Sequence, residues 1–377
     1  GSIKKAFAWP VYKSMTDKNG RNHQILALDI YMPIETIEDS ALHKGGTKVN
    51  LGHVEAEIGG ILNVGELKTQ GGNLKVDTLI QLGELKNEGS EEINVQFNRA
   101  LISSVVHYLK TSDQIDSQVL TKAAIEGLEK ASTIKLITKG NIAAYATKFN
   151  NVAFEVGGDV IIMPIPLVKA YKGYITKEHY QERIDISNLA YELNGDIEII
   201  SQGDVKLIGA DSSKVKVLKI NGRKGATVEP AYEIEYRYSV ETDEDIFSYE
   251  EIITKELNIR PVLHTIGSEN SDALNVEIKS EEGEVRVIGT RIYSKELELR
   301  AGTIDHPRNV ELLPSLRERI YEQSIETSSF GIGFNGGMLT FGAESYEQKK
   351  ESRQELEPTI LRIENRAYIY SEDNICN

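Results

Sequence analysis

"GEVRVIGTRIYSKELELRAG", residues 283–302, repeats the pattern of "GDVKLIGADSSKVKVLKING", residues 203–222. The glycines of the two stretches correspond, beginning with Gly203 and Gly283, which lie 80 residues apart. The apolar positions between the glycines also agree. Because a repeat unit that cannot bury its own apolar face must stack on its neighbours, the chain is predicted to build one architecture from stacked units.

Further copies of this pattern occur along the chain. The stretch 133–159 places Gly140 where the second copy has Gly203, and a weaker copy runs from 359 to 377. Closer to the start, "VGELKTQGG" (64–72) returns as "LGELKNEGS" (82–90), an offset of 18 residues. Short apolar segments separated by Gly, Asn and Asp at such intervals are typical of the coils of a β-solenoid.

The residue types fit such a coil. Each short strand alternates one apolar side chain facing inward with one polar side chain facing outward, and Gly, Asn and Asp tolerate the positive φ angles of corners. Stacking at about 4.8 Å per coil satisfies the backbone hydrogen bonds and aligns equivalent side chains into ladders. We therefore predict an all-β fold, a parallel β-helix (β-solenoid), with short-repeat coils over 36–98 and longer repeats over 132–377.

Composition limits the functions that are compatible with this chain. Its 377 residues are 40% hydrophobic, enough for a folded core, and a formal charge of −15 argues against a nucleic acid partner. The single cysteine, Cys376, excludes an internal disulfide framework, and no apolar stretch reaches the length of a transmembrane helix. The leading Gly1-Ser2 and the end inside a repeat lead us to expect a piece of a longer chain.

Residues 99–131 interrupt the solenoid pattern. Apolar residues recur there at helical spacing, with helix formers between them. We interpret this stretch as a helical insertion; the alternative is that part of it continues the solenoid. The apolar positions are Leu101, Ile102, Val105, Val106 and Leu109, followed by Val119, Leu120, Ala123, Ala124 and Leu128.

Several segments indicate β-hairpins that project from the solenoid. Residues 1–35 read as a lead-in hairpin around a turn at 17–20, and hairpin excursions are predicted within 160–195, 223–265 and 303–358. In "YEIEYRYSV", the candidate contact residues Tyr232, Tyr236 and Tyr238 alternate with polar residues and so share one face.

A second candidate contact surface lies in "SSFGIGFNGGMLTFGAES", residues 328–345. Phe330, Ile332 and Phe334 share one face of the predicted strand, and Asn335 begins the turn. We expect arms of about seven residues, which fall short of the 9 to 11 residues that a strand needs to span a bilayer.

The pattern of 266–302 resembles the hemagglutinin-repeat region of two-partner secretion exoproteins, the filamentous hemagglutinins and contact-dependent growth inhibition toxins of Gram-negative bacteria. The segment "IETSSFGIGFNGGMLTFGAES" is similar to the one that follows the repeats in those proteins, and residues 10–33 together with "GGILNVGELKTQGGNLKV" are similar to the segment that leads into them. The resemblance covers most of the chain from about residue 8, except the helical-looking stretch. The chain departs from the family in its sparse glycine and its many Lys, Ile and Tyr residues.

The resemblance implies a right-handed parallel β-helix that is exported through an outer-membrane transporter partner and forms part of a monomeric surface filament. In the toxin branch, the corresponding repeats are associated with delivery across a target cell's outer membrane. The expected location is therefore secreted or on the surface of a Gram-negative cell, in contact with a target-cell surface. No catalytic residue carries over from the family, and no cofactor is expected.

Three motifs could indicate a binding site, but each is also explained by an ordinary structural feature. "GIGFNG" (331–336) matches the dinucleotide fingerprint, but no helix is predicted after it, so a hairpin turn is favoured. His179 with Glu182 is the nearest approach to a metal pair, and a solvated hairpin face is the simpler reading. The acidic run 243–245 lacks the glycine and the ligand spacing of a calcium loop, so a solvated turn is expected.

Three classes of function follow from these observations. A structural and delivery segment of a secreted exoprotein is our main prediction, and an adhesin that binds through its exposed tyrosines is a close neighbour. The alternative is a polysaccharide-active β-helix enzyme. Its candidate residues are Asp204, Lys206, Arg286 and Arg291, which a solenoid would place at corners and on outward positions in any case.

Overall fold

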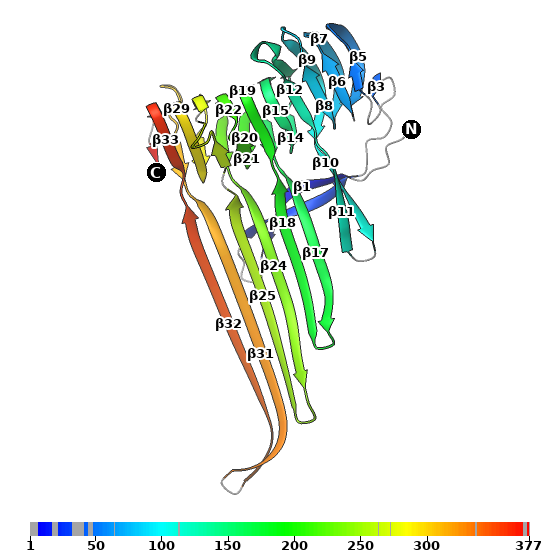
Figure 1. The fold of residues 1–377 in the computed structure, drawn as a ribbon. Helices are drawn as coiled ribbons and strands as arrows, with labels where there is room; N and C mark the ends of the chain where they lie inside the picture. Colours follow the sequence, from blue (N-terminus) through cyan, green and yellow to red (C-terminus); the bar gives the residue numbers. More distant parts are fainter. Residues whose placement is uncertain are drawn as a thin grey trace.

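A computed structural model defines the fold of the chain. It describes residues 7–16, 22–31, 41–43, 48–63, 65–111, 114–262, 264–271, 273–335, 338–371 and 375–376. Nearly all of these residues are strand, and three residues form a 3-10 turn, η1 (Lys130–Ser132). The parallel strands form a β-helix with three faces, which confirms the predicted fold class, and hairpins project from its side (Figure 1).

The first and second faces of the β-helix share four long strands, which begin on the first face and end on the second. The first face contains β4 (Lys48–Asn50), β6 (Glu66–Thr69), β8 (Glu84–Asn87), β12 (Ala124–Gly127), β21 (Ala210–Ser212) and β26 (His264–Ile266), with the beginnings of the long strands β15 (Lys148–Val156), β19 (Tyr191–Ser201), β29 (Thr290–Ala301) and β33 (Ile360–Ser371). The second face contains the ends of those four strands with β5 (Val54–Asn63), β7 (Gly72–Gln81), β9 (Ile93–Ser103), β13 (Ile134–Thr138), β22 (Val215–Gly222) and β27 (Ala273–Ser280).

The third face carries the strands that lead to the hairpins. It contains β3 (Ala41–His43), the ends of β5, β7 and β9, and then β14 (Ile142–Tyr145), β16 (Val160–Met163), β20 (Asp204–Ile208), β23 (Gly225–Glu229), β28 (Val285–Ile288), β30 (Val310–Leu313) and β34 (Ile375–Cys376). Each pair of neighbours in this order belongs to consecutive coils.

The core consists of apolar ladders along the helix axis. Leu136, Phe154 and Ile199 occupy one position in three successive coils, and each is no more than 1% exposed. Polar ladders stabilise the corners in the same way. The buried Asn87 side chain accepts hydrogen bonds from Gly71 N (2.8 Å) and Thr69 Oγ1 (3.2 Å), and donates to the Ser132 carbonyl (2.9 Å). Such pairing is required because an unpaired buried amide is costly.

The repeats found in the sequence correspond to coils. Leu67 pairs with Leu85, as the 18-residue offset predicts, and Ile134 aligns with Ile197 two coils later. Gly203 and Gly283 precede β20 and β28, which are also two coils apart. The separation of 80 residues therefore contains two coils and one inserted hairpin.

The predicted helical insertion over 99–131 is wrong. Residues 99–103 complete β9, and the hairpin β10 (Val105–Thr111) and β11 (Gln114–Thr121) follows it, before β12 returns to the solenoid. The apparent helical spacing arose because the apolar pairs Leu101-Ile102 and Val105-Val106 lie on either side of a corner, in different elements. The Val, Ile, Thr and Tyr residues of this stretch favour strands.

From β9 onward, hairpins leave the third face at every second coil, whereas β5 and β7 lead directly into the next coil. The hairpins follow β9, β16, β23 and β30, whereas the chain turns directly into the next coil after β14, β20 and β28. The hairpin that follows β9 is β10 with β11. The hairpins that follow β16, β23 and β30 are β17 (Ile165–Thr176) with β18 (His179–Leu189), β24 (Ala231–Glu244) with β25 (Ser248–Val262), and β31 (Ser315–Asn335) with β32 (Met338–Glu357). The lead-in hairpin pairs β1 (Phe7–Thr16) with β2 (Asn22–Tyr31).

This alternation has a geometric reason. A hairpin is two strands wide, about 9.6 Å, and two coils also advance by about 9.6 Å. One hairpin for every two coils therefore allows neighbouring hairpins to hydrogen-bond to each other without bending. The structure shows this pairing between β18 and β24 and between β25 and β31.

The residue at the corner after the third face separates the two kinds of coil. Where the chain turns directly, Ala146, Gly209 and Gly289 adopt φ angles of 50°, 52° and 49°. Where the three hairpins of the six-stranded sheet leave, the corner is Pro164, Pro230 or Pro314, whereas the corner before β10 is Ser104. Proline cannot adopt a positive φ and keeps the residue before it extended, so it directs the chain outward into the hairpin.

Candidate functional site

The projecting hairpins form one six-stranded antiparallel sheet in the order β17-β18-β24-β25-β31-β32. The strands lengthen along the helix axis, from 12 residues in β17 to 21 in β31 (Figure 1). At about 3.4 Å per residue, β31 spans about 70 Å. The solenoid therefore presents a long, ordered sheet on one side.

The two faces of this sheet differ in chemistry. Alternation along the strands gathers one set of residues, the tyrosine face, on one side, and all of its members are partly exposed and lie outside the apolar core clusters. The opposite side, the charged face, is formed by Arg183, Asp185, Glu235, Arg237, Glu256 and Arg319. The tyrosine face contains Tyr180, Ile184, Ile186, Tyr232, Ile234, Tyr236, Tyr238, Val240, Ile253, Leu257 and Ile259.

Aromatic contacts order part of the tyrosine face. The ring of Tyr180 meets Tyr174 edge-on at 5.1 Å and Tyr238 at 6.2 Å. The Tyr180 hydroxyl donates to Glu182 Oε1 at 2.6 Å, and this bond with the nearby carboxylate charge raises the pKa of Tyr180 to about 12. Lys255 Nζ lies 5.8 Å from the centre of the Tyr238 ring, in a cation–π contact. The surface thus offers rigid rings together with hydrogen-bonding groups.

The sequence analysis placed Tyr232, Tyr236 and Tyr238 on one strand face, and the structure brings them together there with Tyr180 from the preceding hairpin. Burial raises the pKa of both Tyr232 and Tyr236. Tyr180 was missed because it lies in another excursion, and only the pairing of β18 with β24 connects the two.

Ion pairs tie the strands together on the charged face. Arg237 Nη1 contacts Asp185 Oδ1 at 2.7 Å across β18 and β24, and Arg319 Nε contacts Glu256 Oε1 at 3.0 Å across β25 and β31. Both pairs join different hairpins. They therefore favour the continuous sheet over separate hairpins, although each exposed pair contributes only about 0–1 kcal/mol.

The tips of two hairpins expose apolar side chains. Tyr174 and Ile175 at the end of β17 are 70% and 55% exposed, and Ile246 and Phe247 between β24 and β25 are 90% and 63% exposed. Asp245 accepts hydrogen bonds from Phe247 N (2.7 Å) and Ser248 N (3.0 Å), which closes the turn. Of the acidic run 243–245, only Asp245 therefore lies in the turn, whereas Asp243 and Glu244 end strand β24.

The longest hairpin extends beyond its predicted limits. Arms of about seven residues were expected, whereas β31 and β32 contain 21 and 20 residues. The charged residues of 315–328 and 344–357 hid this pairing because they do not alternate with apolar ones. Phe330, Ile332 and Phe334 lie in β31, but their side chains are outside the described part of the structure, so their role as a contact surface stays a prediction.

The enzyme candidates are only partly brought together. Lys206, Thr227 and Arg286 form one outward ladder on the third face, with Asp204 nearby, whereas Arg291 lies on the first face. Glu229, which the sequence analysis missed, lies one position beyond this ladder at the end of β23. Burial raises the pKa of both Asp204 and Glu229, and the Lys206 charge opposes this rise.

The remaining motifs form no chemical site in the described residues. His179 Nε2 faces Glu241 Oε1 at 3.6 Å rather than Glu182. No group of three or more potential metal ligands gathers in the part of the chain that the structure describes. Residues 331–335 of the glycine-rich motif continue β31. Within the described ranges, no helix has the length and apolarity to cross a membrane.

Comparison with known proteins gives no identification. No family model, no curated protein and no solved structure matches this chain.

Proposed function

We propose that this chain is a non-catalytic structural and delivery segment of a large secreted surface filament protein of a Gram-negative bacterium. In this proposal, the β-helix supplies length and rigidity, and the six-stranded sheet contacts the target cell. The observation that carries the proposal is the sheet itself. From β16 onward, the chain places a hairpin on every second coil and holds these three hairpins as one sheet.

The chemistry of the sheet supports a role in contact. Its tyrosine face exposes rings that are held in fixed orientations, and ordered aromatic side chains supply contact area at a low cost in conformational entropy. Its tips expose the apolar side chains of Ile175, Ile246 and Phe247, which a monomeric chain would ordinarily bury in its core. These features are expected of a surface that meets a partner.

The first test removes the longest hairpin without breaking the solenoid. Residues 314–358 are replaced by one glycine, so that the corner after β30 copies the corner at Gly289 after β28. Co-sedimentation is measured with bacterial outer-membrane vesicles and, in parallel, with eukaryotic cells. We expect the intact chain to sediment with the bacterial vesicles and the variant to remain in the supernatant.

A matched control replaces residues 164–190, the shortest hairpin of the sheet, by one glycine in the same way. Circular dichroism establishes that both variants keep the β-helix. Failure of the intact chain to bind either membrane contradicts a contact role and leaves a passive stalk. If the intact chain and the variant that lacks β31 and β32 bind equally, this hairpin makes no contribution to the contact.

The second test addresses the tyrosine face. Replacing Tyr232, Tyr236 and Tyr238 by Ser removes three rings but leaves the backbone pairing of β24. We expect binding to weaken about tenfold or more, because a buried tyrosine is a frequent hot spot of protein contacts. Replacing Ser239, Thr254 and Gln323 of the opposite face by Ala is the control. Unchanged binding by the tyrosine variant rejects this face as the contact.

A polysaccharide-active enzyme is the second candidate. One observation favours it: Asp204 and Glu229 lie near Lys206 on one face, and burial raises the pKa of both carboxyls, the direction that a general acid requires. The intact chain should then release reducing ends from a panel of polysaccharides. A panel that stays silent excludes this activity.

A further inference from the structure

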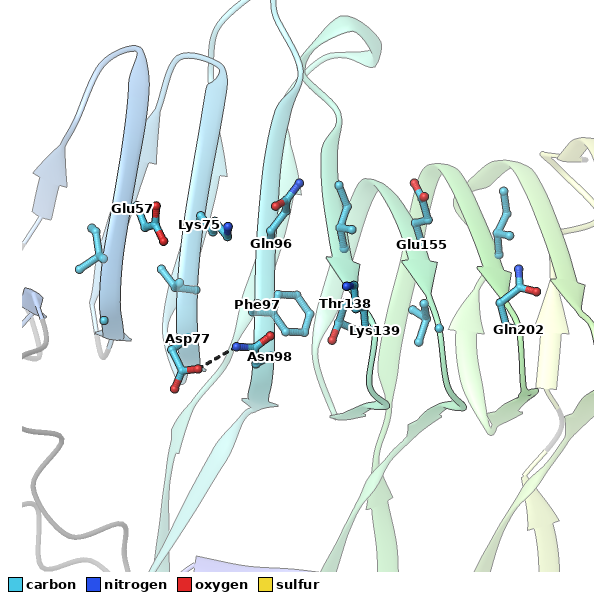
Figure 2. A pocket seen from close by; sticks show the side chains of 17 residues that line it. Glu57, Lys75, Asp77, Gln96, Phe97, Asn98, Thr138, Lys139, Glu155 and Gln202 are labelled. Atoms are coloured by element: carbon cyan, nitrogen blue, oxygen red, sulfur yellow. Dashed lines mark hydrogen bonds between the residues drawn. The ribbon is translucent and has the colours of Figure 1, made fainter.

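A long hollow crosses the second face of the solenoid, away from the corner where the hairpins leave. Its volume is about 990 Å³, and its lining residues come from β5, β7, β9, β13, β15 and the end of β19. Figure 2 shows the strands side by side, with Glu57, Lys75, Gln96 and Glu155 in a row across them. The hollow therefore runs along the helix axis, across six successive rungs.

The lining mixes neutral amides with charges of both signs. Gln96, Asn98 and Gln202 supply amides, Lys75 and Lys139 supply ammonium groups, and Glu57, Asp77 and Glu155 supply carboxylates. Asn98 Nδ2 donates to Asp77 Oδ1 at 2.8 Å, and this bond, with one from Thr78, lowers the pKa of Asp77. The hollow therefore has many hydrogen-bonding groups but no strong net charge.

Several of these groups have no partner. Within the described residues, the side chains of Glu57, Lys75, Gln96 and Lys139 make no hydrogen bond or ion pair, although Glu57 and Lys75 are neighbours in one ladder. Outward charges elsewhere do pair. Lys279, on the same face several coils later, contacts both Glu277 (3.6 Å) and Glu298 (3.3 Å). The hollow is thus a place where polar groups from successive coils remain available to a ligand.

We propose that this hollow, the axial groove, binds an extended, uncharged β-1,4-linked polysaccharide that runs along the helix axis. The rungs repeat at about 4.8 Å, and a straight β-1,4-linked chain advances by nearly the same distance per sugar. Each sugar therefore lies over about one rung, and because successive sugars are turned by half a rotation, alternate sugars present the same edge to the groove. The sugar hydroxyl groups, which both donate and accept, suit a row of amides, ammonium groups and carboxylates.

Other linear polymers fit the axial groove less well. A nucleic acid or a polyanionic glycan meets Glu57, Asp77 and Glu155, and it would require a basic surface. An extended peptide lies across the strands, so it cannot join the sheet by backbone pairing, and its repeat of about 3.4 Å per residue does not match the rungs. A neutral glycan has neither disadvantage.

Calorimetry with defined oligosaccharides tests this proposal on the intact chain. The probes are β-1,4-linked glucose and β-1,4-linked N-acetylglucosamine oligomers of two to eight sugars. We expect affinity for at least one series to rise with length and to level off at about six sugars, the number of rungs at about 4.8 Å spacing. An α-1,4-linked glucose hexamer, which coils, is expected to bind much more weakly.

A variant and its control locate the site. Lys75→Ala with Gln96→Ala should weaken binding about tenfold or more, the loss expected for two hydrogen bonds. Lys219→Ala with Asn221→Ala changes the same face beyond the axial groove and should leave affinity unchanged. No binding of any probe at millimolar concentration, equal loss in both variants, or equal binding of the α-linked hexamer or of an unstructured Ser/Thr-rich peptide overturns the proposal. Because the hairpins are intact in both variants, this outcome is independent of the proposed contact function.

Discussion

The free energy of unfolding is expected to fall by about 4 kcal/mol, because of one side chain, as the pH is lowered from 6.5 to 3. That side chain is His264, which follows β25 and begins the next coil. It is fully buried, its Nε2 lies 3.5 Å from Ser212 Oγ, and its ring meets Tyr191 at 6.5 Å. Burial lowers the pKa of His264 to about 3, and the charge of Asp211 opposes the shift only in part.

The direction of this effect follows from proton binding. In the unfolded chain the histidine has its ordinary pKa of 6.5, so between pH 6.5 and 3 the unfolded chain takes up a proton that the folded chain does not. The stabilisation is therefore complete above pH 6.5 and is lost as the pH falls toward 3. Asp204 and Glu229, whose pKa values are raised, act in the opposite direction.

Comparison of variants isolates the contribution of His264. Denaturant unfolding of the wild-type chain and of His264→Leu is measured from pH 7 to pH 3. The free energy of unfolding of His264→Leu should fall less steeply with decreasing pH than that of the wild type. His306→Leu, which changes an exposed loop histidine, should behave as the wild type. Parallel curves for the wild type and His264→Leu contradict this account.

Gly209→Val is expected to destabilise the chain by about 4 kcal/mol. Gly209 has a φ of +52°, which costs a β-branched residue about 1–2 kcal/mol. A Cβ at this position would lie 2.4 Å from Ala231 Cβ, where the second hairpin leaves the solenoid, and overpacking of this kind costs about 1–3 kcal/mol more. Two costs therefore act at one corner.

Gly52→Val separates these two costs. Gly52 has a φ of +64° but nothing within 4 Å of an added Cβ, so only the backbone cost applies. Denaturant unfolding should show a loss of about 1–2 kcal/mol for Gly52→Val and a clearly larger loss for Gly209→Val. Equal losses would mean that the close approach of the hairpin to the corner makes no contribution.

The sequence predicted the coils because their signal is local. The offset of the Leu67 and Leu85 segments is the length of one coil, and the alternation of Tyr232, Tyr236 and Tyr238 is the period of a strand. The helical interpretation of 99–131 failed for the same reason. Two short strands joined by a corner imitate a helical period when no partner strand is known.

The features that depend on distant partners were not visible in the sequence. Pro164, Pro230 and Pro314 mark hairpin coils, but this becomes clear only when the third face is aligned in space. His264 was one of seven scattered histidines, and nothing near it in the sequence indicates full burial. The axial groove gathers residues from 57 to 202, two or three from each rung, so no short motif represents it.

The central claim is that alternate coils hold their hairpins as one continuous sheet, and amide hydrogen exchange of the native chain tests it most directly. The backbone of β25 is paired on both sides, by β24 and by β31, so its amides should exchange slowly along its length. Replacing residues 314–358 by one glycine removes β31, so the β25 amides that pointed toward β31 should then exchange rapidly. Rapid exchange of β25 in the intact chain, at the rate of the hairpin tips, would show that the hairpins move independently and would contradict the account.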